Sequence, residues 1–564
     1  MAEKLKVSQA MVRALAEEEG VKHIFGHPGG AILPFYDSLF DSPIKHYLMR
    51  HESGASYAAD GFSRATGKIG TCVATSGPGA TNLVTGIAGA WMDSIPMVAI
   101  TGQVPRHMIG NDAFQESDVT GITLPITKHN WLVLDPAEVL PTLKAAFAIA
   151  GHGRPGPVLV DVPRDVQQQE IEYHWPEKVS LPGFKPVQKG HPGQVKKAAD
   201  ALAGAERPLI IAGGGAISGE ASKELKDLAI TLNIPVITTL MGKGAFPERH
   251  PLFIGQPGMH GTKYGNHAIM QADWILSVGM RFDDRVVGLA EHFAPQAKFI
   301  HVDVDPAEIG KNKAPTIPIV GNCKEVLRDM VKESKPRARD GWLKQIDQWR
   351  KEMPLGYKQK SGNGVMPQAV CEMLNILASD AIITTDVGQH QMWMMQLYLC
   401  DEPRQFLTSG GLGAMGYGLP AAMGAKAGRP EKTVINVNGD GSFMMSCMNL
   451  PVAVDEDLPI TVVIFNNKFL GMVRQWQDVF WKKRYSGSDF RTTKTDFVKV
   501  AEGFGAEGIR VTKEEELEDA LKDGIAAQKR GKTMVLDVHI NEWENVSPMV
   551  PPGGRIDQML DLAG

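Results

Sequence analysis

Hydrophobic residues along the chain fall into short continuous runs that alternate with longer stretches of helical spacing. Within residues 1–165 such runs occupy 70–77 (GTCVATSG), 96–102 (PMVAITG) and 156–163 (GPVLVDVP). Continuous apolar runs of this length are typical of parallel strands that are buried on both faces. Their alternation with helices predicts an α/β domain with a doubly wound sheet, whose ligand loops follow the carboxyl ends of the strands.

The same alternation occurs in two further blocks, residues 194–335 and 365–541. The strand candidates of these blocks are 207–215, 234–239, 273–279 and 298–305, then 381–388, 432–441, 458–467 and 533–540. We therefore predict three domains, each a mostly parallel doubly wound sheet flanked by helices. Residues 165–193 are rich in Gln, Pro and Gly without periodicity, and they predict a linker across a surface. The first and third blocks could share a fold, although the sequence contains no clear repeat.

Composition excludes several classes of protein. With 43% hydrophobic and 22% charged residues, a net charge of −5 and a pI near 6.4, the chain is typical of a soluble globular protein without affinity for nucleic acid or membranes. The sequence contains no run of about 18 apolar residues, so it predicts no membrane span. The five cysteines are far apart and form no CxxC pair, which argues against disulfides and zinc. The N-terminal residues lack the features of a signal or transit peptide, so we expect a cytoplasmic location.

Two polar turns follow strongly apolar strand candidates in the third block: 439–442 (GDGS) and 466–467 (NN). Glycines let backbone N–H groups approach phosphate oxygens, and a helix N-terminus adds positive potential. The carboxylate of Asp440 and the amide of Asn467 are hard oxygen ligands that suit Mg²⁺. An isolated GDG is more often a tight turn, but the two turns together favour a site for a diphosphate and a divalent cation.

This segment resembles the cofactor motif of the thiamine diphosphate-dependent enzymes. The resemblance implies that the carbonyl of Phe469 is a third metal ligand and that Met415 supports the bent cofactor, although a methionine in such a run is usually core packing. It also implies cofactor contacts from two further loops and from the turn itself, namely Val387, Gly388, Gln389, His390, Gly413, Gly439, Asp440, Gly441 and Ser442.

In that family, a glutamate at the end of an early strand activates the cofactor. Glu52, in the tripeptide Arg-His-Glu, matches it; without this context the tripeptide would indicate a surface charge cluster. A carboxyl group does this best in a poorly hydrated pocket, where its pKa rises. The resemblance also places Gly30 beside the reacting carbon, and Phe114, Gln115 and Lys128 along a substrate channel. For Lys128 the alternative is a solvated surface charge.

Three features resemble the acetolactate synthases among these enzymes. Trp476 and Met472, within 471–477 (GMVRQWQ), would form the wall of the acceptor site. Arg285 would bind the carboxylate of the acceptor, since guanidinium binds carboxylate bidentately. The alternative for Trp476 is a tryptophan of the hydrophobic core, and the alternative for Arg285 is a structural ion-pair cluster. The middle block resembles the FAD site of biosynthetic members, where FAD performs no net redox chemistry. The residues that this implies are Arg154, Gly213, Gly214, Gly215, Thr239, Leu240, Met259, His260, Gly279 and Arg281.

The resemblance runs from about residue 5 to about residue 560 and ends in a C-terminal arm, residues 542–564, that would fold over the site. It implies decarboxylation of pyruvate and condensation of the hydroxyethyl group with pyruvate or 2-ketobutyrate, the first common step of branched-chain amino acid biosynthesis. It further implies a homodimer or homotetramer in which Glu52 of one chain serves a diphosphate held by another, and it is compatible with a small regulatory subunit. The alternatives are an FAD-dependent pyruvate oxidase and a catalytically silent assembly subunit, against which Glu52, Asp440 and Asn467 argue.

Overall fold

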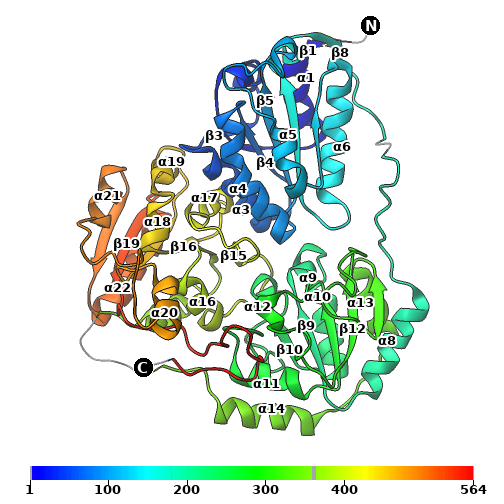
Figure 1. Cartoon of the computed structure of the whole chain (residues 1–564), viewed down its shortest axis with the longest axis vertical. Helices are drawn as coiled ribbons and strands as arrows, with labels where there is room; N and C mark the ends of the chain where they lie inside the picture. The colour runs from blue at the N-terminus through cyan, green and yellow to red at the C-terminus, as the bar shows by residue number, and fades with distance from the viewer. Residues whose placement is uncertain (1–2, 179–180, 358–363, 563–564) are drawn as a thin grey trace.

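A parallel sheet forms in each of the three blocks, and every strand candidate named above becomes a strand. The computed structural model describes residues 3–178, 181–357 and 364–562. Figure 1 shows the three sheets as separate units, each with helices on its faces. The predicted fold class, three parallel-sheet domains flanked by helices, is confirmed.

The first domain has a six-stranded sheet in the order β3-β2-β4-β5-β7-β6, with all neighbours parallel. Its strands are β2 (His23–His27), β3 (Lys45–Leu48), β4 (Gly70–Ala74), β5 (Met97–Gln103), β6 (His129–Leu132) and β7 (Pro157–Pro163). Its helices are α1 (Val7–Arg13), α2 (Leu33–Phe40), α3 (Glu52–Thr66), α4 (Pro78–Asp93), α5 (Val119–Thr123), α6 (Val139–Gly151) and α7 (Arg164–Gln167).

The beginning of the predicted linker is structured. Strand β8 (Glu170–Glu172) pairs antiparallel with β1 (Lys4–Lys6), so the stretch 165–172 belongs to the first domain. Beyond this pair, Figure 1 shows the chain running along one side of the molecule to the middle domain. The linker proper is therefore shorter than the sequence predicted.

The middle domain has a five-stranded parallel sheet in the order β10-β9-β11-β12-β13. Its strands are β9 (Pro208–Ala212), β10 (Val236–Thr238), β11 (Trp274–Val278), β12 (Lys298–Asp303) and β13 (Ile317–Val320). Its helices are α8 (Pro192–Gly204), α9 (Gly214–Ser218), α10 (Ser222–Leu232), α11 (Lys263–Gln271), α12 (Asp284–Val287), α13 (Cys323–Glu333) and α14 (Asp340–Glu352).

The third domain repeats the architecture of the first. Its sheet order, β15-β14-β16-β17-β19-β18, places the strands in the same sequence as in the first domain when each set is counted along the chain. The strands are β14 (Ile382–Thr385), β15 (Phe406–Thr408), β16 (Val434–Gly439), β17 (Thr461–Asn466), β18 (Glu507–Val511) and β19 (Met534–His539). The helices are α15 (Pro367–Leu377), α16 (Gln389–Leu397), α17 (Gly418–Gly428), α18 (Asp440–Met444), α19 (Leu450–Asp455), α20 (Gly471–Phe480), α21 (Phe497–Gly503) and α22 (Leu517–Lys529).

Helices α3 and α17 join the first and third domains through one continuous hydrophobic core. Glycine makes this contact possible, because a Cβ on Gly424 would lie 1.8 Å from the carbonyl oxygen of Ala58, and a Cβ on Gly61 would lie 2.2 Å from that of Ala421. The two helix backbones therefore touch directly. No helix in the described part of the chain combines the length and apolar character that crossing a bilayer requires.

Candidate functional site

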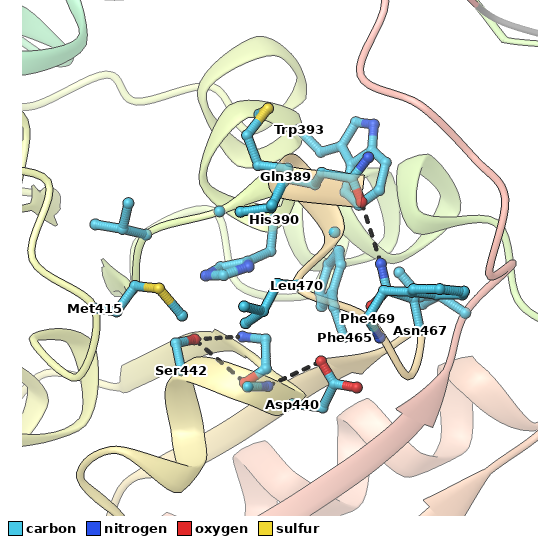
Figure 2. Close-up of a pocket in the computed structure, with 18 residues that line it drawn as sticks. Gln389, His390, Trp393, Met415, Asp440, Ser442, Phe465, Asn467, Phe469 and Leu470 are labelled. Atoms are coloured by element: carbon cyan, nitrogen blue, oxygen red, sulfur yellow. Dashed lines mark hydrogen bonds between the residues drawn. The ribbon is translucent and has the colours of Figure 1, made fainter. Parts of the chain in front are cut away.

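A pocket with about 430 Å³ of empty space lies at the carboxyl ends of β14, β16 and β17. Figure 2 shows side chains from these strand ends and from the start of α16 around the same space. The pocket brings together most of the residues predicted to hold the cofactor and metal, namely Val387, Gly388, Gln389, His390, Met415, Gly439, Asp440, Gly441, Ser442, Asn467 and Phe469. Gly413 lies just outside, and a Cβ on it would be 3.9 Å from Cγ1 of Val387.

Asp440 is the first residue of α18 and its carboxyl group is buried. Its Oδ1 accepts a hydrogen bond from the backbone N–H of Gly441 at 2.9 Å. Burial raises the pKa of Asp440 to about 7, because a charge in a poorly hydrated pocket is costly. A divalent cation bound here would supply the missing counter-charge.

Asn467 and Phe469 lie on the turn after β17. Lys468 between them has φ +57°, a left-handed conformation that is unusual for a residue with a side chain. Oδ1 of Asn467 accepts from the N–H of Phe469 at 3.1 Å, while its Nδ2 donates to Oε1 of Gln389 at 3.1 Å. Among the described residues there is no cluster of three or more His, Cys, Asp or Glu side chains that could hold a metal. Mg²⁺ bound here would rely on one carboxylate, on amide and carbonyl oxygens, and on phosphate oxygens, which is its usual preference.

His390 is buried and has an unused hydrogen-bonding atom. Its Nε2 has no hydrogen-bond partner among the described residues. Burial lowers the pKa of His390 to about 3, so the imidazole is neutral at neutral pH. The ring lies against two glycines of the pocket, since a Cβ on Gly388 or Gly439 would be 2.8 Å or 3.1 Å from its Cε1. Because buried polar atoms are normally hydrogen-bonded, this nitrogen fits a ligand such as a phosphate oxygen.

Gln389 was predicted to reach the diphosphate, but its amide is engaged within the protein. Its Nε2 donates to Oε1 of Gln475 at 2.8 Å and to the carbonyl oxygen of Glu544 at 3.1 Å. Together with the bond from Asn467, these contacts make Gln389 a support for Asn467. The residues of the pocket wall that sequence reasoning missed are apolar, namely Trp393, Phe465, Leu470, Val473 and Ile540. Their only signal was position, next to glycine-rich strand ends.

A second group of predicted residues lies at the carboxyl edge of the first sheet. Glu52, the first residue of α3, is 9% exposed, and its Oε2 accepts a hydrogen bond from Nδ2 of Asn82 at 2.9 Å. Gly30 follows β2, where the N–H of its neighbour Ala31 donates to Oγ1 of Thr75 at 3.2 Å. The hydrogen bond from Asn82 was not predicted, although Asn82 belongs to the glycine-rich stretch 75–82 that follows β4 and begins α4.

Gln115 lies at the same edge, whereas Lys128 does not. Gln115 has φ +59°, and its carbonyl oxygen would be 2.6 Å from a Cβ on Gly77. Lys128 precedes β6 at the amino edge of the sheet, and its Nζ donates to the carbonyl oxygens of Ile149 and His152 at the end of α6. Burial lowers the pKa of Lys128 to about 8. Within one chain the structure does not bring Lys128 to the group around Glu52, and the alternative of a solvated charge does not hold either.

The two groups are separate within one chain. All residues that line the pocket around Asp440 belong to the third domain, and neither Glu52 nor Gly30 is among them. Exposed methionines follow the turn 439–442 in the chain: Met444, Met445 and Met448 have exposed fractions of 46%, 53% and 41%. Apolar side chains gathered at a surface often mark an interface.

A larger pocket, with about 690 Å³ of empty space, lies between the middle domain and the end of α4. Its lining includes a majority of the residues predicted for FAD, namely Arg154, Gly213, Gly214, Gly215, Thr239, Gly279 and Arg281. Arg154 crosses from the first domain, where its Nε donates to Oγ of Ser94 at 2.8 Å, to the middle domain, where its Nη1 is 2.7 Å from Oε1 of Glu308. Leu240, Met259 and His260 are not among the lining residues.

The glycine run of this second pocket also has a packing role. A Cβ on Gly213 would lie 2.3 Å from the carbonyl oxygen of Gly279, and one on Gly215 would lie 2.6 Å from the Cα of Gly279. Two strand-end loops therefore touch through their backbones here. His260, which does not line this pocket, is buried, and burial lowers its pKa to about 4.

The predicted acceptor residues lie on two elements that the C-terminal arm connects. Met472 lines the first pocket, and Trp476 follows one turn later on α20, 5.5 Å from the ring of Phe480. Arg285 on α12 is exposed, with its Nη1 3.2 Å from Sδ of Met259. The arm accepts a hydrogen bond from Gln475 at the carbonyl oxygen of Val546, and its Val550 N–H donates to the carbonyl oxygen of Met259 at 2.9 Å. Phe114, which was predicted to lie along the substrate channel, is 86% exposed within one chain.

No described residue of the arm is among those that line the first pocket. Figure 1 shows it between the third domain and α11 of the middle domain. Nδ2 of Asn266 donates to the carbonyl oxygen of Ile556, and Nζ of Lys263 lies 2.6 Å from Oδ2 of Asp561. The beginning of the arm, at Glu544 and Val546, contacts Gln389 and Gln475, while its later residues pack along the middle domain. A position of the arm over the site stays a prediction.

Comparison with known proteins identifies the family. Residues 5–122, 195–330 and 386–538 match the N-terminal binding domain, the central domain and the C-terminal binding domain of thiamine pyrophosphate enzymes. The probable acetolactate synthase large subunit of Methanocaldococcus jannaschii is 49% identical over 99% of this chain and 95% of its own. The acetolactate synthase of Mycobacterium bovis is 47% identical over 100% of this chain and 92% of its own, and the acetolactate synthase large subunit of Corynebacterium glutamicum is 47% identical over 98% and 89%. The chain therefore belongs to the thiamine pyrophosphate-dependent enzymes, in the family of acetolactate synthase large subunits.

Proposed function

We propose that this acetolactate synthase decarboxylates pyruvate and joins the remaining two-carbon unit to a second 2-keto acid, either pyruvate or 2-ketobutyrate. The observation that carries the proposal is the pocket at the ends of β14, β16 and β17, where the turn 439–442, Asn467, Phe469 and His390 meet. Bound thiamine diphosphate would supply a thiazolium carbon that, once deprotonated, adds to the keto carbon of pyruvate.

The diphosphate and Mg²⁺ would be held by the third domain alone. Asp440, the Asn467 amide and the Phe469 carbonyl would provide oxygen ligands for Mg²⁺. Backbone N–H groups of the turn 439–442 and Nε2 of the neutral His390 would donate to phosphate oxygens. The raised pKa of Asp440, which burial causes, fits a carboxyl group that ionises with a cation beside it.

The activating carboxyl group would come from a second chain. The pocket lining contains no first-domain residue, and exposed methionines follow its turn 439–442 in the chain, which supports a dimer that brings Glu52 of a second chain to this pocket. Asn82 would then hold Glu52 in position through its 2.9 Å hydrogen bond. Gly30 and Gln115, at the same edge of the first sheet, would line the space next to the reacting carbon.

The apolar wall of the pocket suits the two carbon–carbon steps. Met415, Phe465, Leu470, Met472 and Val473 present apolar atoms toward the space above the diphosphate turn. A poorly hydrated environment disfavours the compact charge of a carboxylate more than a delocalised one, and so favours loss of CO₂. It also keeps water from protonating the two-carbon unit before the acceptor arrives. We assign the acceptor's carboxylate to Arg285 and its side chain to Trp476.

Two further assignments complete the proposal. We propose that the pocket lined by Arg154 and the glycines of the middle domain binds FAD in a structural role. Because several relatives are named large subunits, we propose that a small regulatory subunit also binds this chain. Both proposals can be tested by adding the component to the purified chain and measuring binding.

Product analysis tests the proposal directly. Purified protein supplied with thiamine diphosphate, Mg²⁺, FAD and pyruvate should release acetolactate and CO₂ in equal amounts. Acetate together with hydrogen peroxide would instead identify a pyruvate oxidase, and the absence of any pyruvate consumption would identify a silent assembly subunit. Either of these results would overturn the proposed function.

A further inference from the structure

The loop from Ser409 to Met415 connects β15 to α17 and carries Met415 into the first pocket. Two buried carboxylates hold its two ends. Beyond Met415, Asp386 accepts hydrogen bonds from the N–H groups of Gly416 at 2.9 Å and Gly418 at 2.7 Å. Asp386 follows β14 in the same domain, so this half of the support is local.

The other end of the loop is held by a side chain of the first domain. Asp93, the last residue of α4, has a fully buried side chain. Its Oδ1 accepts from the N–H of Gly411 at 2.7 Å, and its Oδ2 accepts from the N–H of Gly410 at 3.1 Å. The loop that enters the pocket of the third domain is therefore fixed at its start by a different domain.

A buried guanidinium orients Asp93. Nη2 of Arg64 donates to Oδ2 of Asp93 at 2.8 Å, and Nε of the same arginine lies 2.5 Å from Oδ1 of Asp60. The hydroxyl of Tyr417, which directly precedes α17, donates to Asp60 at 2.8 Å. The three contacts of Asp93 thus come from a charged donor and two backbone N–H groups, and charge-assisted bonds of this kind are the stronger ones.

The start of the loop is closely packed on both sides. A Cβ on Gly411 would lie 2.8 Å from Oδ1 of Asp93 and 3.0 Å from Cβ of Met92, and a Cβ on Gly410 would lie 2.3 Å from Sδ of Met241 in the middle domain. The start of the loop therefore passes between the end of α4 and the side chain of Met241 in the middle domain.

We propose that Asp93 is a positioning residue for Met415: its carboxylate fixes Gly410 and Gly411, and thereby sets where Met415 stands in the diphosphate pocket. The consequence for catalysis rests on the proposed function, whereas the effect on the loop does not. The end of α4, with Met92, Asp93 and Ser94, also lines the second pocket, so one helix end borders both cavities.

Hydrogen–deuterium exchange of the purified chain tests the effect on the loop. In Asp93→Asn the carboxylate charge is lost, and we expect the peptide spanning 409–416 to exchange about 10- to 100-fold faster, the range for losing hydrogen bonds to a buried charge. The peptide spanning 439–442, on another wall of the same pocket, should keep its wild-type rate. The loop variant Gly411→Ala should produce the same local change, because its Cβ pushes against Asp93 from the other side.

Two matched controls separate positioning from general destabilisation. Glu248→Gln removes a buried carboxylate that pairs with Lys243 at 2.6 Å, between the middle and third domains, without touching the loop. Gly89→Ala adds a methyl group on α4 whose nearest neighbour would be Cδ2 of Leu412, at 4.0 Å in the same loop. Neither control should accelerate exchange at 409–416.

Steady-state kinetics provides the second readout. We expect Asp93→Asn to lower kcat about ten-fold while KM for pyruvate changes by less than about two-fold, because Met415 would act on the cofactor rather than on the acceptor. Wild-type exchange at 409–416 in both Asp93→Asn and Gly411→Ala, or equal acceleration in Glu248→Gln, would overturn the proposal. A wild-type enzyme that makes no acetolactate would refute the proposed function instead, since the exchange result does not depend on activity.

Discussion

The buried carboxyl group of Asp161 gives a quantitative prediction of how the stability of the protein depends on pH. Asp161, on β7, is 1% exposed and accepts hydrogen bonds from Oγ1 of Thr101 at 2.7 Å and from Nε2 of Gln103 at 2.9 Å. The same Nε2 donates to the carbonyl oxygen of Ser117, two residues beyond Gln115. Burial raises the pKa of Asp161 to about 7, against an ordinary value of 3.8.

The direction in which stability changes with pH follows from proton binding. A carboxyl group whose pKa is higher in the folded chain than in the unfolded chain binds its proton more tightly when folded, so stability falls as pH rises. Its destabilisation begins near the unfolded pKa and is complete once the pH exceeds the folded pKa of about 7. A rise of about three in pKa corresponds to a loss of up to roughly 4 kcal/mol at neutral pH and above.

Asp161→Asn should remove this dependence, because an amide resembles the protonated acid in shape and hydrogen bonding. Its Nδ2 can donate to Thr101, whose hydroxyl can rotate, and its Oδ1 can accept from Gln103. We expect the stability of the wild type to fall relative to that of the variant by roughly 1.4 kcal/mol per pH unit between about pH 5 and about pH 7, and the difference to level off above that.

Paired thermal melts of wild type and variant, recorded from about pH 5 to about pH 8, measure this difference. Asp200→Asn is the control, because the Asp200 side chain is 66% exposed and should give a constant difference. Only the change with pH is diagnostic, since altered hydrogen bonds would shift the variant equally at every pH. A flat difference, or a variant that weakens relative to wild type as pH rises, would contradict a buried, protonated Asp161.

The remaining predictions concern the proposed reaction. Asp440→Ala should abolish Mg²⁺-dependent binding of thiamine diphosphate, and calorimetry that shows unchanged affinity would rule out the metal assignment. Glu52→Gln should bind the cofactor but slow its C2 proton exchange, followed by NMR, by orders of magnitude, and mixing it with Asp440→Ala chains should restore part of the activity if the site is shared between chains. The wild type should prefer 2-ketobutyrate over pyruvate by roughly 10–200-fold, the range that one extra methylene in an apolar pocket can give, and Trp476→Leu should reduce this preference. Arg285→Gln should instead weaken capture of both acceptors. An unchanged product ratio in Trp476→Leu would refute the role of Trp476.

The strands that sequence patterns predicted are central in their sheets, with the exception of β10, which lies at an edge. Most of those missed, such as β3, β6, β15 and β18, lie at the edges of their sheets. An edge strand faces solvent on one side and need not be a continuous apolar run: β3 reads KHYL and β18 reads EGIRV. The antiparallel pair of β1 and β8 was also missed, because two three-residue segments far apart in sequence carry no periodicity that connects them.

The candidate site also has parts that the sequence could predict and parts that it could not. The turn around Asp440 and the one around Asn467 could be predicted to meet, because each follows an apolar strand of one parallel sheet. The position of Lys128 could not, because its surroundings depend on the end of α6, which is distant in sequence. Nor could the contact between Asp93 and Gly411, since it joins two domains and no local pattern specifies it.

The shared strand order of the first and third sheets has a consequence for the origin of the molecule. Counted along each domain, the first three strands end in corresponding segments. Residues 28–30 correspond to 387–389, and 75–79 correspond to 439–441. The segment between β3 and α3, which leads to Glu52, corresponds to the segment between β15 and α17, which contains Met415. Duplication of one ancestral domain, followed by complete divergence of the side chains, leaves this pattern. Under the proposed function, the third domain would hold the phosphate and metal, and the first domain would supply the proton chemistry. Helices α3 and α17, which are equivalent in the two copies, pack against each other as the halves of an ancient homodimer would, now fused into a single chain.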